Sequence, residues 1–381
     1  MRMENPLRVL IVDDTVTYRK IVADVLAGCP DVDVVGTAAN GRIALQRLDQ
    51  QAADLLVLDL EMPEMNGQAV LEELRRRNSP TGAIMLSAFT ARGAKATLAA
   101  LETGAFDFVL KPTGTSMEAN VEHLRRELRS KLAAYAHRRS VQQILYGASV
   151  GQAANPPGMR QTGNLPHAAP PPAGSPQVVA LGISTGGPQA LTEMVPQLPA
   201  NLPVPLLIVQ HMPPVFTRSL ADDLNRRTPH CVREGVDGQP IHAGEVWIAP
   251  GGRQMKVQRQ NDQVVLRITD DPPENSCRPS VDYLFRSVAE VYGARAVGVI
   301  MTGMGSDGSL GCRRLKHCGA SIVAQDAATC VVFGMPREPI EKGIADVVAP
   351  LGRIAAEIAR LTGPGTRAAG GRAGQGAAPC K

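Results

Sequence analysis

The sequence contains few aromatic residues and no long apolar segment. Aromatic residues make up 3% of the 381 residues and hydrophobic residues 44%, so any core must consist largely of aliphatic side chains. No apolar run reaches the ~18 residues that a membrane-spanning helix requires. The opening stretch, MRMENPLRVLIVDD, lacks the cleavage site of a signal peptide. We therefore expect a cytoplasmic protein that does not insert into a membrane.

Cysteine is scarce, and its spacing does not suggest a binding site. The seven cysteines are odd in number and scattered, and no two of them form a Cys-x-x-Cys pair. This distribution favours reduced thiols over a disulfide framework or a zinc site of regular ligand spacing.

The charge distribution gives little support for a nucleic-acid partner. The formal net charge is only +4. No basic cluster alternates with aromatic residues, as a nucleic-acid-binding surface would require. The densest basic run, residues 125–139, also contains Glu127 and apolar residues at helical spacing. We interpret it as the solvated face of a helix.

The first third of the chain has the pattern of a parallel α/β domain. Five apolar runs alternate with amphipathic stretches between residues 7 and 125, namely LRVLIV, VDVVGTA, DLLVLD, AIMLSA and FDFVLK. Strands separated by helices predict a parallel sheet covered on both faces. We assign residues 1–125 to this domain. Residues 126–176 follow as a helix, predicted over 118–137, and a Pro- and Gly-rich linker that begins at residue 151.

From Gln177 on, apolar runs again alternate with amphipathic stretches, which predicts a second α/β domain with a mostly parallel sheet. Its predicted strands are QVVALGIS, PLLIVQH, EVWIAP, VVLRIT, ARAVGVIMTG and ASIVAQD, and its predicted helices are PQALTEMVPQL, TRSLADDLNRR, SVDYLFRSVAEVYG and SLGCRRLKHCG. An antiparallel insertion is expected near residues 240–270. We assign residues 177–363 to this domain and expect residues 364–381, rich in Gly and Ala, to be disordered.

Polar residues end the strands of the first domain. Asp13 and Asp14 end the first strand, Asp59 the third, Ser87 the fourth and Lys111 the fifth. Ligands of open α/β sheets bind beyond the carboxyl ends of the strands. Any one of these aspartates alone would more often be a turn or helix cap. Together they predict a Mg²⁺ site in which Ser87 and Lys111 contact a phosphoryl group.

This part of the sequence resembles the response-regulator receiver family. The resemblance rests on DD after the first strand, on LDLEMPEMNG around Asp59 and on LKP at Lys111. It implies that Asp59 accepts a phosphoryl group from a histidine kinase and that Asp13, Asp14 and Asp59 hold Mg²⁺. It also places Phe108 at the family's aromatic switch position.

The second domain contains a possible serine nucleophile. The stretch GISTGGP, residues 182–188, joins a strand to a helix and has the Gly-x-Ser-x-Gly pattern of a nucleophile elbow around Ser184. Such turns also bind phosphate, and a lone histidine at a strand end is usually structural. However, His211 and Asp307 also follow strands, and a serine nucleophile needs a base and an orienting carboxylate. The order Ser, His, Asp differs from that of the common α/β-hydrolases.

Residues 177–350 resemble the catalytic domain of the chemotaxis protein-glutamate methylesterases, the CheB family. The shared motifs are GISTGGP, IVQHM, VWIAPGG, MTGMGSDG, IVAQD and CVVFGMPREPI. With this resemblance, the expected fold is a flavodoxin-like receiver followed by a Rossmann-like serine-hydrolase domain, both doubly wound parallel sheets.

The resemblance also implies roles and partners. Ser184 would be the nucleophile, His211 the general base and Asp307 its orienting carboxylate, while the backbone N–H groups of Met304 and Thr185 would form the oxyanion hole. The substrates would be glutamate methyl esters and glutamines of methyl-accepting chemoreceptors, and no cofactor would be needed at the esterase site. The unphosphorylated receiver would inhibit the esterase, and phosphorylation of Asp59 would relieve that inhibition.

Two other functions remain open from the residues alone. The chain could be a response regulator whose output domain only binds a partner, but the complete Ser/His/Asp set argues against this. It could also be an esterase for small molecules, but the fused receiver and the lack of a hydrophobic lid argue against that.

Overall fold

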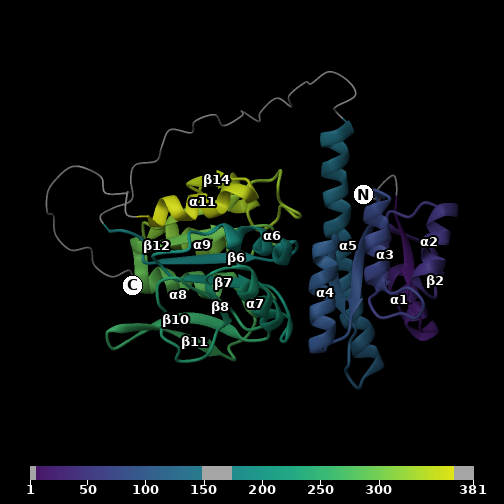
Figure 1. The fold of residues 1–381 in the computed structure, drawn as a ribbon, viewed down its shortest axis with the longest axis horizontal. Coiled ribbons are helices and arrows are strands. Elements are labelled where there is room, and N and C mark those ends of the chain that lie inside the picture. The colour runs from purple at the N-terminus through teal and green to yellow at the C-terminus, as the bar shows by residue number, and fades with distance from the viewer. Residues whose placement is uncertain (1–5, 148–173, 364–381) are drawn as a thin grey trace. The chain divides into compact units, whose positions relative to one another are not determined.

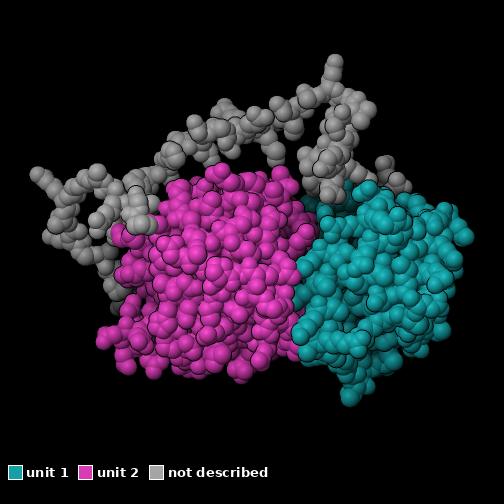
Figure 2. Space-filling view, in the orientation of Figure 1, with its two compact units in different colours: residues 1–147 teal, residues 148–381 magenta. Residues whose placement is uncertain are grey.

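The computed structural model describes residues 6–147 and 174–363. The chain divides into two compact units, residues 1–147 and 148–381 (Figure 2). Most of the predicted linker and the whole predicted tail lie outside the described residues.

The first unit is built on a five-stranded parallel sheet, as the sequence predicts. Its strands are β1 (Leu7–Val12), β2 (Val32–Ala38), β3 (Leu55–Asp59), β4 (Gly82–Ser87) and β5 (Asp107–Leu110), in the order β2-β1-β3-β4-β5. Its helices are α1 (Val16–Ala27), α2 (Gly41–Gln50), α3 (Gly67–Arg76), α4 (Ala91–Thr103) and α5 (Met117–Gly147) (Figure 1). The strand order reverses between β1 and β3, and a ligand of such a sheet binds at this switch point.

The last helix of this unit is longer than the sequence pattern indicates. The predicted domain end at residue 125 falls inside α5, which continues to Gly147. Tyr135 lies in this helix and donates its hydroxyl hydrogen to the Asp54 carbonyl at 2.9 Å, while Lys131 pairs with Asp107 at 2.7 Å. These contacts tie the middle of α5 to the sheet, so the helix packs as part of this unit well beyond the predicted boundary.

The second unit is built on a seven-stranded parallel sheet. Its strands are β6 (Val178–Ile183), β7 (Leu206–Gln210), β8 (Cys231–Glu234), β9 (Glu245–Ile248), β12 (Ala296–Ile300), β13 (Ser321–Gln325) and β14 (Val347–Ala349), in the order β14-β13-β12-β6-β7-β9-β8. The edge strands β8 and β14 are not predicted by the sequence analysis. Strand β8 has four residues, two of them charged, and β14 has only three, so neither produces an apolar run of the usual strand length.

Helices cover both faces of this sheet. They are α6 (Gly187–Met194), α7 (Phe216–Arg227), α8 (Val281–Tyr292), α9 (Ser309–His317), α10 (Arg337–Glu341) and α11 (Leu351–Thr362). Helix α8 packs on α9 and on the antiparallel hairpin of β10 (Gln254–Gln260) and β11 (Gln263–Thr269), whereas α6 packs on α7 and α11 (Figure 1). The hairpin confirms the expected antiparallel insertion. Among the described residues, no helix is long and apolar enough to cross a membrane.

Candidate active site

The predicted catalytic residues lie at the carboxyl ends of three neighbouring strands. Ser184 follows β6, His211 follows β7, and Asp307 lies in the loop after β12. Strand β6 pairs with β7 on one side and with β12 on the other. The strand order reverses between β6 and β12, so the sheet topology brings these residues to the place where such folds bind ligands.

The turn that carries Ser184 is held by hydrogen bonds to residues at the ends of the two strands that flank β6. The Ser184 N–H donates to the Thr302 carbonyl at 2.9 Å, and the Gln210 side-chain amide donates to the Ser184 carbonyl at 3.0 Å. The left-handed residue of the turn is Gly186, with a φ of 78°, whereas Ser184 itself is not at positive φ. The sharp bend therefore depends on a glycine rather than on strain at the serine.

The His211 ring is oriented by Asp307. Its Nε2 lies 2.8 Å from Asp307 Oδ2. Because a carboxylate only accepts, Nε2 carries the proton, and Nδ1 is left as the nitrogen that can take one. Among the described residues, Ser184 Oγ makes no hydrogen bond, so the histidine–aspartate half of the predicted triad is formed and the serine half is not. Such bonds are often loose before substrate binds.

The Asp307 carboxylate is the best-bonded group of the site. Besides His211, it accepts hydrogen bonds from Asn275 Nδ2 at 3.1 Å and Ser280 Oγ at 2.9 Å. The backbone N–H groups of Val281 and Asp282, in the first turn of α8, donate to it at 2.7 and 3.2 Å. The positive end of a helix stabilises an anion at this position.

These contacts shift the pKa values of the pair in opposite directions. Burial lowers the pKa of His211, but the hydrogen bonds to Asp307 and Cys277 and the nearby negative charge outweigh burial and raise it to about 9. Burial raises the pKa of Asp307, but its hydrogen bond to His211, the charge of His211 and the other donors lower it to about 2. The pair therefore favours an imidazolium beside a carboxylate, as a general base needs after it has accepted a proton.

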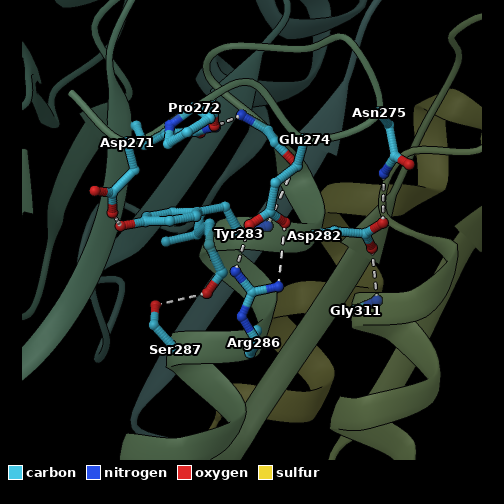
Figure 3. Close-up of polar contacts among 12 residues, drawn as sticks. Asp271, Pro272, Glu274, Asn275, Asp282, Tyr283, Arg286, Ser287 and Gly311 are labelled. Carbon is cyan, nitrogen blue, oxygen red and sulfur yellow. Dashed lines mark hydrogen bonds and ion pairs between the residues drawn. The ribbon is translucent and has the colours of Figure 1, made fainter. Parts of the chain in front are cut away.

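Two polar residues that the sequence analysis did not single out support Asp307. Asn275 Nδ2 also donates to Asp282 Oδ2 at 2.9 Å, and the Gly311 N–H donates to Asp282 Oδ1 at 2.6 Å (Figure 3). Burial and the charge of Asp307 raise the pKa of Asp282 to about 6, against the effect of these donors. Asp282 could have been suspected from its place in the first turn of a predicted helix, but no pattern indicates Asn275.

The predicted aspartate cluster of the first unit is also brought together. Ligand oxygens of Asp13, Asp14 and Asp59 all lie within 4.8 Å of one another. Lys111 Nζ lies 2.8 Å from both Asp13 Oδ2 and Asp59 Oδ2. Burial raises the pKa of Asp59 to about 6, although Lys111 opposes that effect. Three carboxylate oxygen donors at the rim of the sheet fit Mg²⁺. Because Lys111 is the one cation paired with Asp13 and Asp59 among the described residues, the remaining negative charge would favour a bound cation.

Four further residues were predicted to take part in the two sites, and the structure shows the surroundings of each. The Thr97 hydroxyl lies 2.7 Å from Ser87 Oγ, and Phe108 is buried in β5. Thr185 is buried next to Ser184, and Met304 is partly exposed in the loop after β12. The roles of these four residues stay predictions.

We predict that Gly303→Ala perturbs the Ser184 turn. An added Cβ would lie 2.7 Å from Ser184 Cβ and 2.3 Å from Met335 Sδ. Such overpacking costs roughly 1–3 kcal/mol of unfolding free energy, and Ser184 should react more slowly with a fluorophosphonate probe. The matched control is Gly352→Ala in α11, where an added Cβ meets nothing within 4 Å. Equal labelling of the two variants would contradict the prediction.

We also predict that Asp307→Asn lowers the pKa of His211. The carboxylate that favours the imidazolium is removed while burial remains, so the pKa should fall by roughly 1–3 units. NMR titration of the His211 ring in the folded chain measures this shift. Asp271→Asn is the control, because Asp271 is exposed and contacts Tyr283. An unchanged His211 pKa in Asp307→Asn would show that the pair does not titrate as described.

Both units match known families. Residues 9–121 match the response regulator receiver domain, and residues 179–358 match the CheB methylesterase family. The catalytic domain of the Thermotoga maritima CheB methylesterase is 42% identical, with a TM-score of 0.48, and the match covers 49% of this chain and 99% of that one.

Two relatives match nearly the whole of this chain. The chain is 47% identical to a protein-glutamate methylesterase/protein-glutamine glutaminase of Desulfotalea psychrophila over 92% of this chain and 97% of that protein. It is 41% identical to a protein of the same name from Trichodesmium erythraeum, over 93% of this chain and 99% of that protein. Similarity at this level over nearly the whole length of both proteins shows that the chain belongs to the protein-glutamate methylesterase/protein-glutamine glutaminase family, with a receiver domain preceding a CheB methylesterase domain.

Proposed function

We propose that this chain hydrolyses the methyl esters of glutamate side chains on methyl-accepting chemoreceptors and deamidates glutamines of the same receptors in the cytoplasm. The observation that carries the proposal is the pair formed by the half-buried His211 and the buried Asp307 beside the Ser184 turn, at the carboxyl ends of the central strands. Family membership supports the same reaction, since the relatives are named for both activities.

The reaction is an acyl transfer through Ser184. As Ser184 Oγ attacks the ester carbonyl carbon, His211 Nδ1 takes the hydroxyl proton. Asp307 holds the other ring nitrogen at 2.8 Å and stabilises the imidazolium that forms. The imidazolium then protonates the leaving methoxide, and methanol departs. Water, deprotonated by the same nitrogen, releases glutamate from the acyl-enzyme, and with glutamine the first leaving group is ammonia.

The developing oxyanion needs donors near Ser184. We assign this role to the backbone N–H groups of Met304 and Thr185, as the family resemblance implies. Gly303 supports the assignment for Met304, because it lies directly against Ser184. An oxyanion-hole donor typically contributes about 3 kcal/mol to transition-state stabilisation. The esterase proposal includes no cofactor.

The receiver is proposed to control this activity. Asp59 would accept a phosphoryl group from a histidine kinase, with Mg²⁺ held by Asp13, Asp14 and Asp59 and the phosphoryl charge balanced by Lys111. The ion would neutralise charge on the phosphoryl oxygens. Phosphorylation would then raise the rate of receptor demethylation, by favouring a state of the chain in which the receiver does not inhibit.

Ser184→Ala should abolish methanol release from methylated receptors. Loss of a catalytic serine typically lowers the rate by several orders of magnitude. Methanol release is measured with the folded full-length variant, and circular dichroism checks the fold. Ser219→Ala, a buried serine in α7, is the control and should keep substantial activity. Near-normal turnover by Ser184→Ala would refute the nucleophile assignment.

Asp59 should be the one residue that a small acyl phosphate modifies in the presence of Mg²⁺. Intact-mass measurement should show one added phosphoryl group, which Asp59→Asn prevents and chelation of Mg²⁺ suppresses. Asp24→Asn, an exposed carboxylate of α1, should leave the modification unchanged. The phosphorylated chain should release methanol faster than the unmodified chain. Modification of Asp59→Asn to the same extent would place the site elsewhere.

A further inference from the structure

A thiol that the esterase reaction does not use lies beside the catalytic histidine. Cys277 Sγ lies 3.8 Å from His211 Nδ1, whereas Asp307 bonds to the other ring nitrogen, Nε2. Among the described residues, His211, Cys277 and Asp307 form one of two groups whose ligand atoms are close enough to hold a metal ion. The proposed reaction uses Nδ1 of His211 but makes no use of the thiol.

We propose that His211 Nδ1 and Cys277 Sγ together bind a thiophilic divalent cation such as Zn²⁺, and that this ion inhibits the esterase. The inhibitory part rests on the proposed role of His211, whereas the binding site does not.

The separation of the two atoms suits a shared zinc ion. Zn–S bonds are about 2.3 Å and Zn–N bonds about 2.0–2.1 Å, so a tetrahedral ion holds its sulfur and nitrogen ligands about 3.6 Å apart. The observed 3.8 Å needs only a small adjustment of either side chain. Water would complete the coordination, and the thiol proton and the Nδ1 proton of the imidazolium would both leave to solvent.

The surroundings of His211 are already those of a metal ligand. A histidine that binds zinc almost always donates its other ring N–H to a carboxylate, a backbone carbonyl or water, which fixes the ring and makes it a better ligand. Asp307 provides this contact through Nε2 and is itself fixed by the first turn of α8. The His211 side chain is 14% exposed and Cys277 is half-buried, so an ion from solvent can reach both.

The loop that carries Cys277 is held in an unusual conformation. Asn275 and Ser276 both have positive φ, at 51° and 62°. Such residues cost of order 1–3 kcal/mol each and persist only where the surrounding structure imposes them. Here Glu274 pairs with Arg286 at 2.6 Å and Asn275 bonds to Asp282, so α8 anchors the loop (Figure 3). The thiol is therefore held in place beside His211 without an ion.

The ion would inhibit by occupying the lone pair on which catalysis depends. With a metal on Nδ1, His211 cannot take the proton of Ser184. Sulfur and imidazole ligands select Zn²⁺ over Mg²⁺, which prefers oxygen. The site is thus chemically distinct from the carboxylate cluster of the receiver.

The binding test uses alkylation of the unaltered full-length chain under reducing conditions. Zn²⁺ should protect Cys277 from iodoacetamide, as peptide mass spectrometry reports, and Mg²⁺ should not. Protection should persist in Ser184→Ala, which has no turnover, and be lost in His211→Gln. Cys277 alkylated equally with and without Zn²⁺ would overturn the site whatever the fate of the esterase assignment.

The inhibition test measures methanol release with increasing Zn²⁺, each variant relative to its own zinc-free rate. Cys277→Ser and Cys277→Ala should each raise the half-inhibitory concentration by at least about tenfold, since one of two protein ligands is removed. Cys231→Ser, a half-buried thiol of β8, should respond as the unaltered chain does. Unchanged zinc sensitivity in both Cys277 variants would refute the proposal. Protection of Cys277 without inhibition would refute its inhibitory role and the assignment of Nδ1 as proton acceptor.

Discussion

The carboxylate of Asp307 is the group on which the candidate active site depends. It is almost completely buried, yet it is ionised, because it accepts hydrogen bonds from His211, Asn275, Ser280 and the first turn of α8. Burying a charge without such donors would cost several kcal/mol. The carboxylate therefore joins three parts of the chain that are distant in sequence, and it fixes which nitrogen of His211 remains available to Ser184.

Both units place a buried carboxylate near the carboxyl ends of the strands of a parallel sheet, but the surroundings of the two carboxylates give them different chemistry. Asp59 has Lys111 as its cation and Asp13 as a like-charged neighbour, and burial raises its pKa to about 6. Asp307 has the end of a helix and a histidine, and these partners lower its pKa to about 2 despite burial. The first arrangement has an excess of negative charge that suits a cation and a phosphoryl group. The second is already balanced and suits stabilisation of an imidazolium.

The sequence by itself was enough to predict both sheets and the strand ends that carry the polar residues. Buried parallel strands leave continuous apolar runs, and the residues that follow them must lie at one edge of the sheet. Asp13, Asp14 and Asp59 were predicted to meet on this basis, and the structure brings them together. The pairing of His211 with Asp307 was suggested by the positions of both residues after strands and assigned from the family resemblance. The structure shows that their strands flank β6. Short edge strands and the full length of α5 were missed, since neither produces a distinct pattern.

Only the tertiary structure decided how the side chains of the site are oriented and how their pKa values are shifted. Asn275 and Cys277 reach the site because a loop with two left-handed residues packs on α8, where it bonds to Asp282, and no periodicity or spacing encodes such a contact. The choice of Nδ1 as the proton acceptor likewise depends on which side of the ring faces Asp307. Local sequence determines the strands and helices because those depend mainly on neighbouring residues, whereas the turn around Ser184 is also held by Thr302 and Gln210. Side-chain orientation and pKa depend instead on burial and on donors supplied by distant segments, which exist only once the chain has folded.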